Sequence, residues 1–181
     1  MEKHIRKPNR LKGYDYSTPG AYFVTICVQG RHNVLGKIVG DGSPVPGNKQ
    51  IGVSLSEFGG IVHDYIKRIS EKYPDVLVDE YVIMPNHIHM LIGLTGKPTG
   101  CAGGTGNPSP TTSLGNVIGW LKYQTTKSIN EFCQEQGHRF WQRSYHDHII
   151  RTRPEYEQIR QYIVSNPELW EQDCFYDPDA L

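Results

Sequence analysis

The stretch YVIMPNHIHMLIGL, residues 81–94, carries the clearest information about the fold of this chain. Two runs rich in apolar and β-branched residues, 76–84 and 87–94, are separated only by Pro85 and Asn86. Such a short connection can join antiparallel strands, whereas a parallel pair needs a long crossover. The stretch therefore predicts two adjacent antiparallel strands.

Helices and further strands are expected on both sides of this pair. Apolar residues recur at spacings of three and four in two segments, which is the period of an amphipathic helix. A third helix should begin at Thr152, which caps it with Pro154 and Glu155 in the first turn, and should end at Asn166-Pro167. The first two helices are expected at 56–72 and 113–135, and the other strands at 21–29, 34–39, 51–55 and 145–151.

This order of elements predicts the α+β class, with helices packed on an antiparallel sheet, in a single domain spanning residues 1–181. Hydrophobic residues make up 37% and charged residues 21% of the chain, as in globular proteins, and no apolar run approaches the roughly 20 residues of a membrane span. No hydrophobic stretch follows the first four residues, so we expect no secretory signal. Cys27, Cys101, Cys133 and Cys174 are scattered, so we expect reduced thiols and a cytoplasmic protein.

The net charge of zero gives no support for nucleic-acid binding, but the charges are unevenly placed. A basic arm covers about 1–13 and an acidic tail about 168–181. The arm is suited to phosphate groups, although solvated charged termini are common. The segment 95–112, rich in Gly, Pro and Thr, is expected to be a flexible loop.

The most informative local motif is His87-Ile88-His89. Side chains alternate along a strand, so the two imidazoles share one face and can bind one divalent cation, with at least one further ligand from elsewhere. The alternative is that two histidines merely line an exposed face of the sheet. An H-x-H motif alone does not distinguish these possibilities.

Tyr162 and Asn166 form a second candidate pair. They lie four residues apart on the expected helix, and therefore on one face. An Asn side-chain oxygen can bind a hard cation, which would place Tyr162 beside the metal. The alternative is that Tyr162 belongs to the core, because Ile159 and Ile163 flank it.

The segment Tyr145–His148 holds two more histidines at the same spacing. His146 and His148 could compete as ligands, although a structural or supporting role with Asp147 is favoured. A zinc hydrolase using His87, His89 and His148 with an activated water is therefore a rival interpretation.

Three segments together resemble one family. They are RLKGYDYSTPGAYFVTICVQGR (10–31), YVIMPNHIHMLIGL (81–94), and FWQRSYHDHIIR (140–151) followed by YIVSNP (162–167). They resemble the REP-associated tyrosine transposases, which belong to the HUH single-tyrosine group. The resemblance covers about 10–170. It implies a ferredoxin-like, RRM-like HUH nuclease fold, with His87 and His89 as the metal-binding pair, Tyr162 as the nucleophile and Asn166 as a third ligand.

The resemblance also implies an activity. The expected reaction is metal-dependent cleavage and strand transfer of single-stranded DNA, with Mg²⁺ or Mn²⁺, through a 5′-phosphotyrosine intermediate, at hairpin or palindromic DNA, by a monomer or homodimer. A domesticated protein that binds DNA without cutting it is the alternative. The long 95–112 loop and the neutral charge depart from the family pattern. Candidate phosphate contacts are Lys122, Lys127, Arg143, Arg151 and Arg153.

Overall fold

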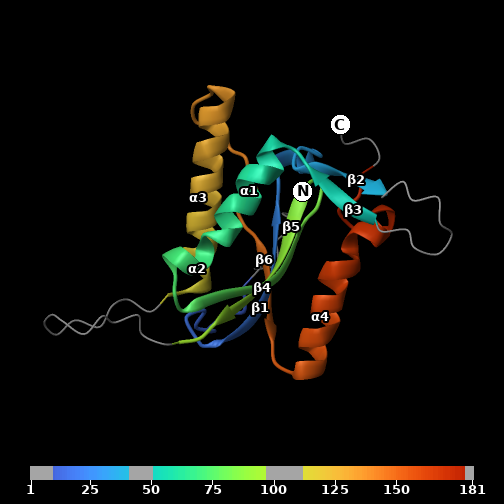
Figure 1. Cartoon of the computed structure of the whole chain (residues 1–181). Coiled ribbons are helices and arrows are strands. Elements are labelled where there is room, and N and C mark those ends of the chain that lie inside the picture. The colour runs from blue at the N-terminus through green and yellow to red at the C-terminus, as the bar shows by residue number, and fades with distance from the viewer. Residues whose placement is uncertain (1–9, 41–50, 97–111, 178–181) are drawn as a thin grey trace, which may run out of the picture.

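The computed structural model describes residues 10–40, 51–96 and 112–177, so most of the basic arm and of the 95–112 loop lies outside the described residues. Its centre is a four-stranded antiparallel sheet in the order β4-β5-β1-β6 (Figure 1). The predicted pair at 76–94 is confirmed as β4 and β5. The strands are β1 (Gly20–Cys27), β4 (Val76–Ile83), β5 (His87–Leu94) and β6 (His146–Ile150), with a separate hairpin of β2 (Gly36–Gly40) and β3 (Ile51–Leu55).

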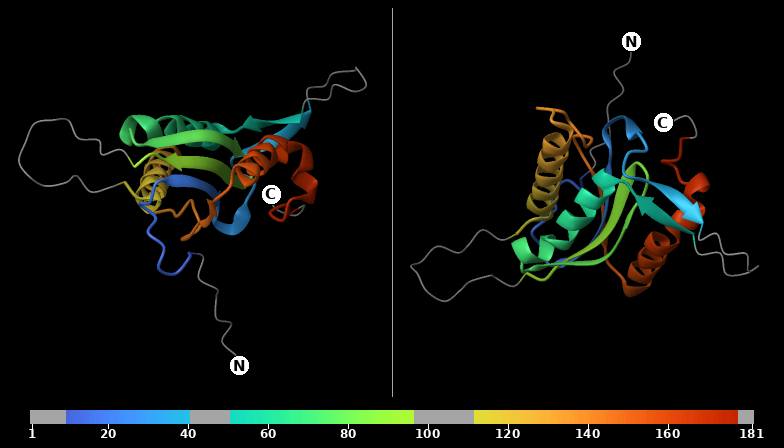
Figure 2. Two further views of the ribbon diagram at one scale, coloured as in Figure 1. Left: turned by 90° about the horizontal axis from the view of Figure 1, so that it is seen from below. Right: turned by 45° about the horizontal axis from the view of Figure 1, so that its top comes forward.

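The helices lie on both faces of this sheet (Figures 1 and 2). On one face are α1 (Glu57–Lys67), α2 (Ile69–Lys72) and α3 (Leu114–Cys133), and on the other are α4 (Arg153–Ser165) and the 3-10 helix η2 (Asn166–Gln172). A short 3-10 turn, η1 (Gln29–Arg31), follows β1. Together with the strand order, this arrangement confirms the α+β class and is that of a ferredoxin-like fold with an additional helical layer.

Local chemistry explains where α4 begins and ends. The Thr152 side chain accepts a hydrogen bond from the Glu155 amide, as the predicted cap requires. At the other end, Pro167 has no amide hydrogen and disfavours the α conformation before it. The chain does not leave the helical path there, however, but continues as η2. This continuation was not predicted, and it brings residues beyond Pro167 back to the sheet.

The alternation of side chains on β5 divides the core into two parts. Ile88, Met90 and Ile92 face α1 and α3 in the larger hydrophobic cluster. Leu91 faces the other way and joins a smaller cluster with Ile150 and Ile163 beneath α4. His87 and His89 share the face of Leu91, so they lie between the sheet and the α4–η2 layer. None of the described helices is long and apolar enough to cross a membrane.

Candidate active site

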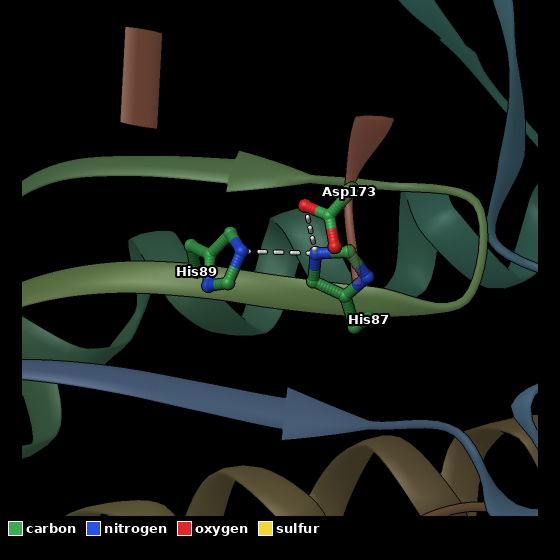
Figure 3. A group of neighbouring side chains, drawn as sticks. All are labelled: His87, His89 and Asp173. Carbon is green, nitrogen blue, oxygen red and sulfur yellow. Dashed lines mark hydrogen bonds and ion pairs between the residues drawn. The ribbon is translucent and has the colours of Figure 1, made fainter. Parts of the chain in front are cut away.

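His87 and His89 form the centre of the candidate site. Their side chains leave the same face of β5, and their Nε2 atoms are 3.0 Å apart, as the spacing predicts (Figure 3). Both are buried, with 0% and 1% of their surface exposed. Two nitrogens bound at right angles to one ion, each at roughly 2.1 Å, would also be about 3 Å apart. The pair is therefore spaced as ligands of a single cation.

The proton on His87 is placed by Asn86. The Asn86 amide nitrogen donates to the carbonyl oxygens of Phe175, at 2.9 Å, and Arg31, at 3.2 Å. This leaves its Oδ1 as the atom 2.9 Å from Nδ1 of His87. Because Oδ1 can only accept, Nδ1 of His87 carries the hydrogen and Nε2 presents a lone pair towards His89. Orienting a ligand through its second ring nitrogen is typical of metal-binding histidines.

His89 is oriented from β1. Its Nδ1 is 2.8 Å from the hydroxyl of Thr25, a buried residue that pairs with it across the sheet. When the hydroxyl accepts this hydrogen bond, Nε2 of His89 also carries a lone pair. Phe23 stacks on the ring, with centroids 5.1 Å apart. Both imidazoles are thus held so that their Nε2 atoms converge.

Burial also keeps the two rings neutral. It lowers the pKa of each imidazole to about 3, with smaller contributions from Arg31 for His87 and from His87 for His89. A neutral imidazole is the form that binds metals.

This pKa shift predicts how stability depends on pH. With both values depressed below the ordinary 6.5, the unfolded chain binds more protons than the folded one between pH 6.5 and about 3. In buffer with a chelator, the urea midpoint should therefore fall as the pH is lowered through this range. At pH 5, a His87→Gln, His89→Gln double variant should take up about two fewer protons on unfolding than the unaltered protein does. If the urea midpoint of the double variant depended on pH in the same way as that of the unaltered protein, the two histidines would not be the source of the pH dependence.

Asp173 completes a three-residue group that could hold a metal. Its Oδ2 is 4.0 Å from Nε2 of His87, and one ligand atom from each of the three residues lies within 4.8 Å of the others (Figure 3). The amide of Phe175 donates to its Oδ1 at 2.7 Å, which fixes the carboxylate. From the sequence, Asp173 was expected only as part of the acidic tail. Its approach to the histidines depends on the course of η2.

Asn166 is also brought to this cluster. Its side chain is 1% exposed, and its amide nitrogen donates to Oδ2 of Asp173 at 3.3 Å. Its Oδ1 is buried and has no hydrogen-bond partner among the described residues. An unpartnered buried oxygen costs roughly 1–3 kcal/mol, which a bound cation would offset. Two imidazoles with carboxylate and amide oxygens therefore form a donor set that fits a divalent metal.

Tyr162 stands at the open side of the cluster. Its hydroxyl is 3.4 Å from Nε2 of His89 and 3.5 Å from Oδ2 of Asp173. The side chain is 39% exposed, so it is not a core residue. Its ring packs against His89 and meets Phe23 edge-on. Burial, and next the negative charge of Asp173, raise the pKa of Tyr162 above its ordinary value.

The candidate phosphate contacts are not gathered on one surface. Lys122, Lys127 and Arg143 line a cleft of about 850 Å³ beside α3, whereas Arg151 and Arg153 line one of about 470 Å³ near the start of α4. Several already have partners. Lys122 donates to the carbonyls of Gln142 and Arg143, and Lys127 and Arg153 pair with acidic residues one turn further along their helices.

His146 and His148 lie apart from the group of residues that could hold a metal. Both are exposed on β6, and Nε2 of His148 is 2.7 Å from a carboxylate oxygen of Glu155. Within the part of the chain that the structure describes, the group able to hold a metal comprises His87, His89 and Asp173, without His148. The zinc site with His148 as third ligand is therefore not assembled in this structure.

The contacts of Asn86 predict its importance for metal binding. Asn86→Ala should leave Nδ1 of His87 without its acceptor and raise the dissociation constant for Mn²⁺ about 10- to 100-fold. Calorimetric titration measures this constant. Asn130→Ala, which removes another amide that donates to a backbone carbonyl, serves as control and should leave it unchanged. Equal affinities in Asn86→Ala and the unaltered protein would show that Asn86 does not orient the ligand.

The chain is thus a ferredoxin-like α+β protein in which two histidines converge beneath a tyrosine carried by a helix. No family model matches the chain. It is 34% identical to an uncharacterized protein of Haemophilus influenzae, over 96% of this chain and 94% of the relative, and belongs to the same family. It is 25% identical to a Haemophilus influenzae protein named "Putative REP-associated tyrosine transposase", over 84% and 73% of the two chains.

A solved structure shows the same fold. A REP-associated tyrosine transposase bound to a REP hairpin superposes with a TM-score of 0.50 and 16% sequence identity, over 93% of this chain and 73% of the other. The resemblance to REP-associated tyrosine transposases that the three motifs predicted is confirmed.

Proposed function

We propose that this protein is a transposase-like enzyme that cleaves and rejoins single-stranded DNA, with Tyr162 as the nucleophile. One observation carries the proposal. The Tyr162 side chain is partly exposed and its hydroxyl lies 3.4 Å from Nε2 of His89, so a phosphate that approaches from the exposed side can meet both the hydroxyl and a cation. The family resemblance supports the same chemistry.

His87 and His89, with Asn166 or Asp173, would hold the divalent cation, for which we propose Mg²⁺ or Mn²⁺. When bound, the cation polarises the non-bridging oxygens of the scissile phosphate and fixes its orientation. The second nitrogens of the two imidazoles remain engaged by Asn86 and Thr25, so the ligands need no reorientation.

Tyr162 then attacks phosphorus. A bond forms between its hydroxyl oxygen and phosphorus, the bond from phosphorus to the 3′ oxygen breaks, and that oxygen takes up a proton. The products are a 5′-phosphotyrosine link and a free 3′-hydroxyl. Because the phosphodiester energy is kept in the covalent link, a 3′-hydroxyl from another strand can reverse the step and join the two ends.

The tyrosine must lose its proton during this step. Burial and Asp173 raise its pKa, so the phenol is neutral near pH 7 before a cation binds. Two acceptors lie within 3.5 Å of the hydroxyl, Nε2 of His89 and Oδ2 of Asp173. With the imidazole lone pair directed at the cation, Asp173 is the group that remains to accept the proton. We therefore assign the general-base role to Asp173 and the third-ligand role to Asn166.

Two substitutions separate these roles. Asn166→Ala should raise the dissociation constant for Mn²⁺ at least about tenfold, because it removes a ligand oxygen. Asp173→Asn should lower the cleavage rate at saturating metal by about 10²- to 10⁴-fold, with metal affinity little changed, because it removes the base. Calorimetry and single-turnover cleavage measure the two quantities. The reverse pattern would make Asp173 the ligand and contradict the assignment.

As substrate we propose single-stranded DNA next to a hairpin or palindrome, because the structurally similar transposase is bound to a REP hairpin. Arg151 and Arg153, near the start of the helix that carries Tyr162, would contact the strand, whereas Lys122, Lys127 and Arg143 line a separate cleft beside α3. A direct test is cleavage of an end-labelled hairpin oligonucleotide with Mn²⁺ or Mg²⁺. We expect cutting in the single-stranded flank that a chelator abolishes. Tight binding without cutting at any metal concentration would favour the domesticated DNA-binding protein.

A further inference from the structure

Helix α4, which carries Tyr162, has little apolar contact to hold it in place. Within α4, all of whose residues are described, Ile163 alone is fully buried. Tyr156 and Ile159 are half-buried beside it. Apolar packing of this extent resists separation of the layers but only weakly resists sliding or rotation of the helix. The position of the Tyr162 hydroxyl therefore depends on additional contacts.

A bulge in the edge strand β4 supplies the partners for such contacts. Val78 pairs with Ile92 and Glu80 with the preceding residue Leu91, so Asp79 is an extra residue in the strand. In a regular strand, Asp79 and Glu80 would point to opposite faces. The bulge shifts the alternation, so that both carboxylates are directed to the α4 face.

Two residues of α4, one turn apart, bind these carboxylates. The Tyr156 hydroxyl donates to Oδ2 of Asp79 at 2.7 Å. The Arg160 guanidinium bridges both acids, with Nε 3.6 Å from Asp79 and Nη2 3.3 Å from Glu80. The Arg160 side chain is 50% exposed, so this ion pair adds little to global stability. Contacts at two successive turns nevertheless fix both the rotation and the axial position of the helix.

We infer that Asp79, Glu80, Tyr156 and Arg160 form a positioning clasp, which sets α4 so that the Tyr162 hydroxyl stands beside His89. Tyr162 is two residues beyond Arg160 on the same helix. If the clasp contacts are lost, any rotation or translation of α4 therefore displaces the Tyr162 hydroxyl as well. A displacement of 1 Å at a reacting group can cost about a hundredfold in rate. The four are positioning residues and do not touch the substrate. Their kinetic effect rests on the proposed function, whereas their geometric effect does not.

The kinetic test uses Arg160→Met, which keeps the aliphatic part of the side chain. The maximal rate of cleavage should fall about 10- to 100-fold, while KM for the DNA and the dissociation constant for Mn²⁺ stay within about twofold. Arg160→Lys, which retains the charge, should recover most of the rate. Tyr156→Phe removes a single hydrogen bond without altering packing, and should show a smaller loss in the same direction even if Arg160→Met folds poorly.

Glu157→Gln is the matched control, because it breaks the ion pair with Arg153 within α4 and leaves the contacts to β4 intact. It should leave the rate unchanged. An equal loss in Glu157→Gln and Arg160→Met would overturn the clasp. A change in KM for the DNA with an unchanged maximal rate would also overturn the clasp.

A second measurement separates the clasp from the enzymatic proposal. With 3-fluorotyrosine incorporated, the fluorine resonance of Tyr162, assigned by its loss in Tyr162→Phe, reports the surroundings of the ring without any reaction. It should shift or broaden in Arg160→Met and Tyr156→Phe but not in Glu157→Gln. If the resonance changes in the clasp variants although the unaltered protein never cuts DNA, the clasp is supported and the proposed function is wrong. An unaltered resonance in both clasp variants overturns the clasp, whatever the cleavage rate.

Discussion

Replacing Tyr162 with phenylalanine is expected to abolish covalent adduct formation and lower cleavage by more than about a thousandfold. The substitution removes the proposed nucleophilic oxygen and retains the ring that packs on His89 and Phe23. The Tyr162 hydroxyl lies 3.4 Å from Nε2 of His89 and 3.5 Å from Oδ2 of Asp173, which are long distances for hydrogen bonds. The free energy of unfolding should therefore change by about 0.5 kcal/mol or less.

Binding of hairpin DNA should persist in Tyr162→Phe, because the hydroxyl contributes to chemistry and not to recognition. Tyr176→Phe provides the control, because this partly exposed tyrosine also lies in the C-terminal region and its ring meets Trp170 edge-on. Its cleavage rate should be unchanged. Cleavage near the original rate in Tyr162→Phe would show that another tyrosine or a water molecule is the nucleophile.

Loss of either histidine is expected to have an effect of similar size. His87→Ala and His89→Ala should each abolish metal-dependent cleavage, again by more than about a thousandfold, while Tyr162 is still present. Calorimetry should detect one Mn²⁺ per chain in the unaltered protein and none in these variants at the same concentrations. His87→Gln and His89→Gln, which fill more of the buried space, test whether the loss follows from the missing ligand and not from a cavity.

His146→Ala is the matched control for the histidine variants. Its imidazole is exposed on β6, outside the group proposed to bind the metal, so cleavage and metal affinity should remain within about twofold. Retained metal-dependent activity in His87→Ala and His89→Ala would place the cation elsewhere and contradict the site.

The strands and the long helices could be predicted because their causes are local, whereas the 3-10 helix η2 was not predicted. The tight connection at Pro85-Asn86 determined the antiparallel pair, and Thr152 with Glu155 determined the start of α4. What the pattern could not provide was the layer in which each helix lies. An apolar stripe shows that a helix is buried on one side, but not that α4 packs against the face opposite α1 and α3.

The candidate site likewise contains residues that the sequence pattern could bring together and residues that it could not. Spacing of two on a strand places His87 and His89 on one face, and spacing of four on a helix does so for Tyr162 and Asn166. Asp173 has no periodic relation to any of them, because the seven-residue η2 sets its position. The role of Asn86 was equally hidden, since its amide bonds to Arg31 and Phe175, which are 55 and 89 positions away. The candidate phosphate contacts remain predictions.

If Tyr162 is the nucleophile, DNA becomes covalently joined to its hydroxyl oxygen during cleavage, and this covalent adduct can be isolated. The full chain is incubated with end-labelled single-stranded DNA bearing a hairpin, in Mn²⁺ and in parallel in Mg²⁺, and the products are separated on a denaturing gel. The retarded band is then digested with protease and its linked peptide identified by mass spectrometry. We predict a metal-dependent adduct in which a 5′-phosphate is attached to Tyr162. Cleavage without any protein–DNA adduct, or an adduct on a different residue, would contradict the account.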